Sequence, residues 1–271
     1  MNLIKVILTN NECYQRGRTI RPRGIMWHST GCNNPTLKRY VQPDVEGIGK
    51  NKYHNDWNRP GLYVCVHAFI GKLENGEVAV VQTLPWNHRG WHAGSGKNGS
   101  ANNTHISFEI CEDDRHNEAY FRECWRNAVE LTAMLCKEYH LDPMEDGVVI
   151  DHRDGSKRGI ASAHGDVEHW SKLFGKSMKD ARRETAFYMK NGYHEEDTPE
   201  PEPAAPEIRY HTMGDLKEDE NARQWYWPTI EKLIEKGIIR GAGGTGDDMI
   251  LDLGTDAIRV LVWLDRAEIF G

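Results

Sequence analysis

The chain has 271 residues, a formal net charge of −7 and a hydrophobic fraction of 38%, with a mean hydropathy of −0.70. This length accommodates one sizeable domain and a small second one, and the low hydropathy indicates a linker or very polar loops. The negative charge argues against nucleic acid as the main partner, because phosphate binding requires a basic surface. The sequence has no apolar stretch of the roughly 18–20 residues that a membrane span needs, and its N-terminal apolar run is too short for a signal peptide. We therefore expect a soluble protein that is made in the cytoplasm.

The cysteines are scattered and form no C-x-x-C pair, so the sequence predicts no disulfide framework. In a chain of this length without a signal peptide, we expect them to be reduced and mostly buried. They are Cys13, Cys32, Cys65, Cys111, Cys124 and Cys136.

The first part of the chain predicts two strands and a long loop. Residues 1–23 are typical of a short strand followed by an Arg-rich loop. Residues 24–28, Gly-Ile-Met-Trp-His, form an apolar run that leads directly into a histidine and then into small residues. This pattern predicts a strand that ends in a polar site. Residues 33–61 have turn residues at high density and indicate an irregular loop with a helical piece around Pro35–Val41.

A strand over Leu62–Gly71 and a returning strand over Val78–Gln82 are joined by an Asn-Gly turn within 74–77, which predicts a hairpin. His67 lies inside the first of these strands. We interpret it as a packed, hydrogen-bonded histidine in preference to a metal ligand.

Residues 86–103 are rich in Gly, Asn and Ser and predict a surface loop with Trp91 and His92 at its centre. The strand that follows, His105–Cys111, contains Glu109 between apolar residues. A carboxylate there is costly unless it is paired or used, so Glu109 either points to solvent or faces a site.

Two helices are predicted, over Asn117–His140 and Ser177–Lys190, from apolar residues at three- and four-residue spacing. The expected buried face of the first helix holds Phe121, Trp125, Ala128, Leu131 or Thr132, and Leu135, and its opposite face holds Arg122, Arg126, Glu130 and Lys137. The expected buried side of the second helix holds Met178, Ala181, Thr185 and Tyr188.

The segment 147–170 has the densest cluster of chemically active side chains. The β-branched run 148–150 ends in a polar stretch, which is typical of a buried strand that delivers side chains to a site at its end. His152, His164 and Asp166 are candidate metal ligands there, because two imidazoles and a carboxylate form a common three-ligand zinc set. His28 also follows a hydrophobic strand, so a metal can take His28, His152 and one of His164 or Asp166. The alternative is a solvated polar loop.

Residues 195–206 alternate Pro with Glu and Ala, which predicts an extended linker that forms no core. Residues 207–271 predict a small module with helices over Thr229–Lys236 and Thr255–Ala267. A module of this size has a thin core, which favours association with itself or with another surface.

Four motifs, in this order, resemble the zinc-dependent N-acetylmuramoyl-L-alanine amidases of the amidase-2 type, which are related to T7-type phage lysozyme and to peptidoglycan recognition proteins. The resemblance covers about residues 20–190. It implies an α/β fold with a central mixed β-sheet flanked by helices and a zinc site at the sheet edge, beside a small, mainly helical C-terminal module. The motifs are Trp27-His28-Ser-Thr, Trp91-His92-Ala-Gly, Ile106-Ser-Phe-Glu109-Ile and His152…His164-Gly-Asp166.

The resemblance also implies roles for individual residues. Zinc would be held by His28, His152 and Asp166, and Glu109 would be the catalytic carboxylate. His164 stands where relatives commonly have lysine, so it is either an oxyanion stabiliser or an alternative ligand. His92 and Trp91 would contact the substrate.

The implied reaction is hydrolysis of the amide bond between N-acetylmuramic acid and L-alanine in bacterial peptidoglycan. The C-terminal module resembles the surface-layer-homology-like wall-binding units of clostridial-type phage endolysins. We therefore expect a catalytic domain at 1–194, the linker at 195–206 and a wall-polymer-binding module at 207–271. Together with the missing signal peptide, this favours a phage or prophage lysin that is made in the host cytoplasm and acts at the cell wall.

Several alternatives remain at this point. The chain can be a non-catalytic peptidoglycan-binding protein or a bacterial autolysin of the same fold. It can also be a cysteine peptidase with Cys32 or Cys65 as nucleophile, or a non-haem iron protein, since two histidines and a carboxylate also bind iron. Metal analysis separates the zinc, iron and metal-free alternatives.

Overall fold

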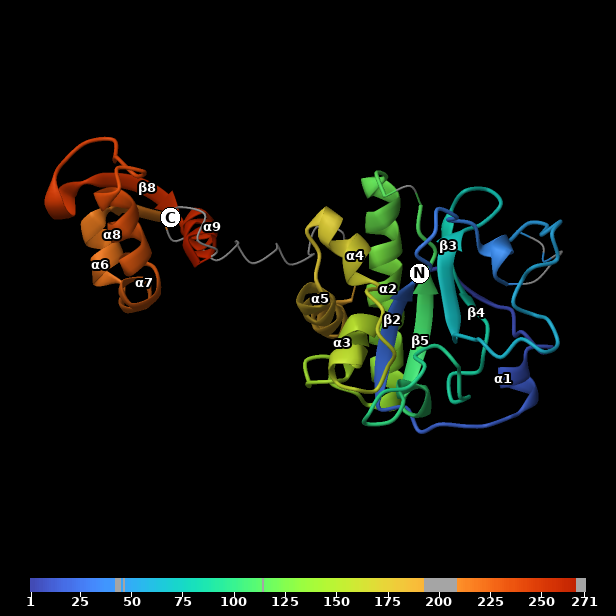
Figure 1. Ribbon diagram of the computed structural model, residues 1–271. Coiled ribbons are helices and arrows are strands. Elements are labelled where there is room, and N and C mark those ends of the chain that lie inside the picture. Colours follow the sequence, from blue (N-terminus) through green and yellow to red (C-terminus); the bar gives the residue numbers. More distant parts are fainter. Residues whose placement is uncertain (42–44, 46, 114, 193–208, 267–271) are drawn as a thin grey trace. The chain divides into compact units, whose positions relative to one another are not determined.

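The computed structural model describes residues 1–41, 45, 47–113, 115–192 and 209–266, and the chain divides into two compact units, Met1–Pro199 and Glu200–Gly271 (Figure 1). The expected linker at 195–206 lies outside the described residues. Among the helices that are described, none is long and apolar enough to span a bilayer.

The first unit is built on a six-stranded sheet with the strand order β1-β4-β3-β5-β2-β6. β3 and β4 are antiparallel and every other neighbouring pair is parallel, which confirms the expected mixed sheet. The strands are β1 (Leu3–Lys5), β2 (Gly24–Ser29), β3 (Ala68–Lys72), β4 (Val78–Gln82), β5 (His105–Ile110) and β6 (Val149–Asp151).

The two predicted long helices are present, and each begins at a capping residue. Asn117 accepts a hydrogen bond from the Tyr120 backbone at the start of α2, and Ser177 and Asp180 form a capping box at the start of α5. The helices of this unit are α1 (Glu12–Gln15), α2 (Glu118–Tyr139), α3 (His152–Lys157), α4 (Glu168–Ser171) and α5 (Met178–Asn191), with 3-10 turns η1 (Leu37–Arg39), η2 (Ala101–Asn103) and η3 (Lys172–Phe174).

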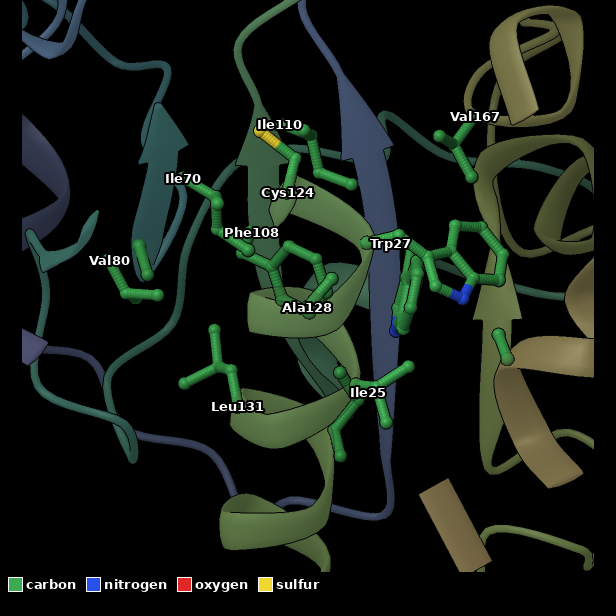
Figure 2. Close-up of a cluster of buried hydrophobic side chains, with 14 of the residues drawn as sticks. Ile25, Trp27, Ile70, Val80, Phe108, Ile110, Cys124, Ala128, Leu131 and Val167 are labelled. Atoms are coloured by element: carbon green, nitrogen blue, oxygen red, sulfur yellow. The ribbon is translucent and has the colours of Figure 1, made fainter. Parts of the chain in front are cut away.

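The main core lies between α2 and one face of the sheet. Ile25 and Trp27 of β2 and Phe108 of β5 pack in the same cluster as Ala128 and Leu131 of α2 (Figure 2). The predicted buried face of α2 is therefore confirmed. The opposite face was wrong at one position, because Glu130 is buried and its carboxylate lies 2.5 Å from the Met1 amino group.

Strand alternation places a different set of side chains on the other face of the sheet. Met26 and His28 alternate with Ile25 and Trp27, so they point away from α2. Loop residues cover this face, for example Ala93 and Ala101, which pack against Met26. The face opposite α2 therefore carries the polar group of His28 as well as a second apolar cluster, which includes Phe69 and Val81.

Three local predictions differ from the structure, and a fourth, on His67, is confirmed. The strand expected from Leu62 joins the sheet only at Ala68, because the preceding residues follow a different path and Cys65 bridges Trp91 instead. His67 precedes β3 and is buried, with Nε2 2.7 Å from the His88 carbonyl oxygen, so its packed and hydrogen-bonded state is confirmed. The helical piece around Pro35–Val41 is the short turn η1, and α3 and α4 stand where a loop was expected.

Over its described residues, 209–266, the second unit combines five helical segments with an antiparallel pair of strands, β7 and β8. Its small core consists of Tyr210, Leu216, Ala222, Ile230, Ile258 and Val262. The elements are β7 (Arg209–Thr212), α6 (Met213–Glu218), α7 (Glu220–Trp225), α8 (Trp227–Glu235), η5 (Gly246–Asp248), β8 (Ile250–Gly254) and α9 (Thr255–Arg266).

Candidate metal centre

The register of three neighbouring parallel strands brings the candidate residues together. His28 on β2 pairs with Glu109 on β5, and Trp27 pairs with Asp151 on β6. His152 is the next residue after Asp151, so it stands level with His28 on the same face. These side chains therefore meet at the carboxyl ends of the strands, on the face opposite α2.

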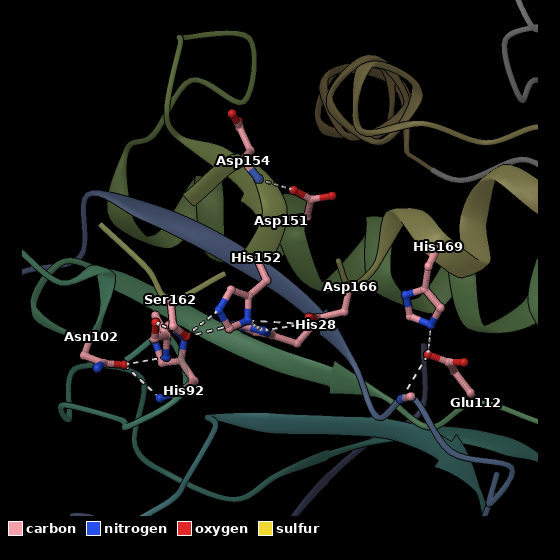
Figure 3. Close-up of polar contacts among 12 residues, drawn as sticks. His28, His92, Asn102, Glu112, Asp151, His152, Asp154, Ser162, Asp166 and His169 are labelled. Carbon is pink, nitrogen blue, oxygen red and sulfur yellow. Dashed lines mark hydrogen bonds and ion pairs between the residues drawn. The ribbon is translucent and has the colours of Figure 1, made fainter. Parts of the chain in front are cut away.

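Asp166 completes a compact triangle with the two histidines (Figure 3). His28 Nδ1 lies 3.1 Å from His152 Nδ1 and 3.0 Å from Asp166 Oδ2, and the distance from His152 Nδ1 to Asp166 Oδ2 is 3.6 Å. Both imidazoles are buried and the carboxylate is half-buried. The three atoms face one another, although His28 lies far from the other two residues in the sequence.

The triangle has the dimensions of a tetrahedral zinc site. A zinc ion with ligand bonds of 2.0–2.1 Å separates neighbouring ligand atoms by about 3.3 Å, which lies within the range of the three distances above. Among the described residues, these three form the group whose ligand atoms lie mutually close enough to hold one metal ion. The donor set and its spacing therefore fit Zn²⁺.

The outer nitrogens of both imidazoles are oriented by other side chains. His28 Nε2 lies 3.0 Å from His92 Nδ1, and His152 Nε2 lies 3.3 Å from Ser162 Oγ. Such partners fix the ring orientation of metal-binding histidines. Asn102 in turn accepts hydrogen bonds from the backbone N–H groups of His92 and Ala93, at 2.8 and 3.0 Å, and so holds the loop in place.

The protonation states suit metal binding, which requires neutral imidazoles and an ionised carboxylate. Burial lowers the pKa of His28 and, further, that of His92. Burial opposes ionisation of Asp166, but the hydrogen bonds of His152 and His28 hold its pKa well below the usual range.

Glu109 is the acid–base candidate beside this triangle. Its Oε2 is buried and has no hydrogen-bond partner among the described residues. Burial, and then the negative charges of Asp166 and Glu112, raise its pKa well above the usual range. A raised pKa favours uptake of a proton, which suits a carboxyl group that accepts a proton and later releases it.

The remaining candidates lie at the edge of the site. His164 is exposed, and its ring centroid is 4.5 Å from that of His152. Trp91 is also exposed, with the Arg89 guanidinium 5.2 Å from its ring centroid. Asp151, which flanks the ligand, caps α3 by accepting a hydrogen bond from the Asp154 backbone at 2.7 Å.

Two positioning residues, Asn102 and Ser162, were not predicted from the sequence. Asn102 lies in the short turn η2 and Ser162 in the loop after α3, and nothing in the local pattern distinguishes them from their neighbours. Cys65 was, with Cys32, one of the two cysteines considered as a nucleophile. The hydrogen bond with Cys13, and burial, raise the pKa of the Cys65 thiol well above its usual range, which disfavours the thiolate form that a nucleophile needs.

Residues 18–166, more than half of the chain, match the protein family described as N-acetylmuramoyl-L-alanine amidase. The chain belongs to this amidase family. The matched stretch includes the whole triangle and Glu109.

Two curated relatives share part of this amidase sequence. N-acetylmuramoyl-L-alanine amidase CwlH of Bacillus subtilis is 34% identical over 92 residues, which make up 34% of each of the two chains. N-acetylmuramoyl-L-alanine amidase CwlA of a Bacillus species is 38% identical over 61 residues, 22% of this chain and 24% of the relative. The similarity therefore spans about a quarter to a third of these relatives.

The fold is also similar to that of a solved hydrolase. The crystal structure of the Staphylococcus aureus hydrolase AmiA, in complex with its ligand, has a TM-score of 0.50 with 21% sequence identity, and the match covers 71% of this chain and 86% of that one. At this identity the match supports the α/β architecture alone.

Proposed function

We propose that this chain is a zinc-dependent N-acetylmuramoyl-L-alanine amidase that cleaves the amide bond between N-acetylmuramic acid and the L-alanine of the peptidoglycan stem. The observation that carries the proposal is the triangle of His28, His152 and Asp166, with Glu109 beside it in strand register. Family membership supports the same bond specificity.

The proposed chemistry is hydrolysis by an activated water molecule. A Zn²⁺ ion held by the triangle would supply a water of lowered pKa and polarise the amide carbonyl. Glu109 takes a proton from the attacking water as the oxygen bonds to the carbonyl carbon. The C–N bond then breaks, and Glu109 passes this proton to the departing nitrogen of L-alanine.

Histidines at the rim complete the proposed mechanism. If His28 binds metal through Nδ1, its Nε2–H donates to His92 Nδ1, and neutral His92 then carries its own proton on Nε2. This Nε2 is buried and has no hydrogen-bond partner among the described residues, so its N–H lacks an acceptor, and a substrate oxygen would supply one if the covering side chains move aside. His164, whose ring lies near that of His152, would stabilise the oxyanion, and Trp91 would offer a flat apolar face to the substrate.

The test is to digest purified bacterial cell walls with the full chain and identify the new chain ends. An amidase releases new L-alanine amino termini without new reducing sugar ends. Elemental analysis of the same preparation should show about one zinc per chain. Intact walls would leave a non-catalytic binder as the better explanation, and iron in place of zinc would favour an oxygenase-type site.

The second unit is proposed to hold the enzyme at the wall. Its separate compact core supports a tethered module that acts independently of the metal centre. We assign it a cell-wall polymer as partner, with self-association as the alternative. A lysin of phage or prophage origin, made in the host cytoplasm, is the biological role that this arrangement fits best.

A further inference from the structure

A pocket of about 330 Å³ opens on the first unit at the loop that leads to His92. This volume lies at the lower end of the range for small-ligand sites. Its lining consists of three arginines, two aromatic rings and one thiol. The lining residues are Cys13, Arg16, Arg18, Tyr63, Arg89 and Trp91.

Two extended segments, 63–65 and 89–91, place aromatic and basic side chains of the pocket on the same side of the backbone. Cys65 and Trp91 form an antiparallel bridge, with backbone hydrogen bonds of 3.2 and 2.9 Å. Since alternate residues of an extended segment share a face, Tyr63 and Arg89 lie on the same side as this pair. The guanidinium of Arg16 lies 5.0 Å from the Tyr63 ring centroid, and that of Arg89 lies 5.2 Å from the Trp91 centroid.

The positive charge of the pocket is poorly neutralised. Arg16 has one distant carboxylate, with its Nε 3.8 Å from Glu12. Within the described part of the chain, neither Arg18 nor Arg89 has a carboxylate within 4.0 Å, and Arg89 Nε donates instead to Asn103 Oδ1 at 2.7 Å. Burial, and then the charge of Arg18, lower the pKa of Arg89. A concentration of poorly neutralised cations in a protein of net charge −7 indicates a site for an anion.

The pocket adjoins the metal centre through the backbone. Trp91 lines the pocket, and the next residue, His92, contacts His28 of the triangle. A ligand that occupies the pocket can therefore belong to the same polymer that reaches the triangle. A pocket of this size takes one charged group and its neighbouring atoms.

We propose that this pocket is an anion subsite, which binds a carboxylate or phosphate group of a cell-wall polymer while the adjoining apolar atoms or sugar ring pack on Trp91 and Tyr63. Guanidinium groups bind both anions through paired charge-assisted hydrogen bonds, and the flat rings suit the uncharged part of the ligand. The assignment of a wall polymer rests on the proposed amidase function. Two wall components carry such anions: the peptide stem, through its carboxylates, and phosphate-bearing polymers.

The test measures equilibrium binding to the full, metal-loaded chain by calorimetry. The first probe is a free stem peptide, which has no bond to muramic acid and cannot be cleaved, and it is compared with the same peptide after amidation of its carboxylates. The second probe is a glycerol phosphate oligomer. Arg18→Gln should weaken binding of the preferred anionic probe about tenfold, which is typical of losing one charge-assisted contact.

Matched variants separate the pocket from general charge effects. Arg21→Gln removes the same charge from an exposed arginine of the same loop that does not line the pocket, so it should leave affinity unchanged. Arg16→Gln is a second pocket variant and should weaken binding like Arg18→Gln. Far-ultraviolet circular dichroism checks that each variant is folded.

Each outcome decides the proposal. Arginine-dependent binding of the free peptide, lost on amidation, assigns the subsite to the peptide stem, whereas arginine-dependent binding of the oligomer assigns it to a phosphate polymer. If the pocket and Arg21 variants behave like the unaltered chain with both probes, there is no anion subsite. Wall digestion is measured separately. If the chain digests walls but its binding of the probes does not depend on these arginines, the proposed amidase activity stands and only the proposed subsite is rejected.

Discussion

Asp166 contributes a single oxygen, Oδ2, to both edges of the triangle that it forms with His28 and His152. Replacing it with alanine leaves two imidazoles, which hold zinc far less tightly than a three-ligand set. We expect Asp166→Ala to lose its zinc and its lytic activity. Elemental analysis after dialysis measures the first, and turbidity of a wall suspension measures the second.

The matched control for this prediction is Asp154→Ala. Asp154 is another carboxylate of the same segment, and it pairs with Arg158 at 3.3 Å and lies outside the triangle. The Asp154→Ala variant should therefore keep its zinc. Stoichiometric zinc in Asp166→Ala would show that Asp166 is not a ligand and would transfer the third position to His164.

Substitution of Glu109 should have a different effect from substitution of a triangle residue, because the proposed role of Glu109 is to transfer protons and not to hold the metal. Glu109→Gln keeps the shape of the side chain but removes the base, so turnover should fall by ~10²–10⁴-fold with zinc content unchanged. Steady-state cleavage of a soluble muropeptide measures this. Glu77→Gln, an exposed change in the β3–β4 turn, is the control and should have normal turnover. Near-normal turnover in Glu109→Gln would remove this residue from the mechanism.

At the scale of elements, a polar clasp joins the ends of β2 and β5 to α4. Glu112 Oε1 lies 2.8 Å from His169 Nε2 and also accepts a hydrogen bond from the Gly31 backbone at 3.0 Å. The Glu112 side chain is 1% exposed and that of His169 is 29% exposed. The clasp therefore ties the segment that carries Asp166 to the strands that carry His28 and Glu109.

The clasp should make stability depend on pH. The hydrogen bond to Glu112 raises the pKa of His169 above 6.5, so its contribution is full below that pH and is lost as pH rises through the raised value. Burial opposes ionisation of Glu112, but the His169 hydrogen bond lowers its pKa below 4.5, so its contribution is full above that pH and is lost as pH falls through the lowered value. The pair is therefore strongest between pH 4.5 and 6.5.

We expect His169→Ala to lower the free energy of unfolding by about 1–3 kcal/mol within that window and by less outside it. Urea unfolding of both proteins at several pH values measures the difference. Glu112→Gln should flatten the pH dependence in the same way, since it removes the charge of the pair. A difference that is constant across pH would mean that the two side chains are not ionised partners.

The sequence predicts those elements that are long enough to show a full period. α2 and α5 each run through several turns, so their apolar faces are visible, and β2 and β5 show an apolar run that ends in a polar group. α3 and α4 have only six and four residues, too few for a helical period to appear in the pattern. The clasp between Glu112 and His169 joins residues from separate elements, and no local pattern indicates such a pair.

The candidate site was likewise predictable only where the local sequence carries the signal. Each triangle member stands out because it follows an apolar strand or lies in a His- and Asp-rich loop. The choice of Asp166 over His164 as third member depends on the path of the loop after α3, which spacing alone does not fix. The pocket at Trp91 likewise combines arginines from two distant segments, and only the fold brings them together.

At the scale of the whole molecule, the two compact units have separate cores. We expect residues 1–194 to fold alone and to bind zinc, because the triangle and Glu109 all belong to this part. Its cleavage of small soluble muropeptides should match that of the full chain, whereas its lysis of intact cells should be weaker, most of all at low enzyme concentration. The reason is that a wall-bound module raises the effective concentration of the enzyme at its substrate.

Cosedimentation provides the complementary measurement for the second unit. Residues 207–271 fused to a fluorescent reporter should sediment with host cell walls, and the reporter alone should stay in solution. If the fusion remains in solution, the module is not a wall binder, and analytical ultracentrifugation of the fusion then tests self-association. Tyr226 and Trp227 pack against the core of this unit, so their rings serve its stability at least in part.

Because side chains alternate between the two faces of the sheet along β2, the metal centre can form only when this strand pairs in the correct register. Trp27 faces α2 and His28 faces the triangle, so a one-residue slip of this strand would exchange the two side chains. An imidazole would then enter the apolar core without a partner, and an indole would stand where a ligand is needed. A chain with mispaired strands would thus be unstable and could not form the triangle, so the proposed metal binding and hydrolysis both require a sheet that has assembled in the right register.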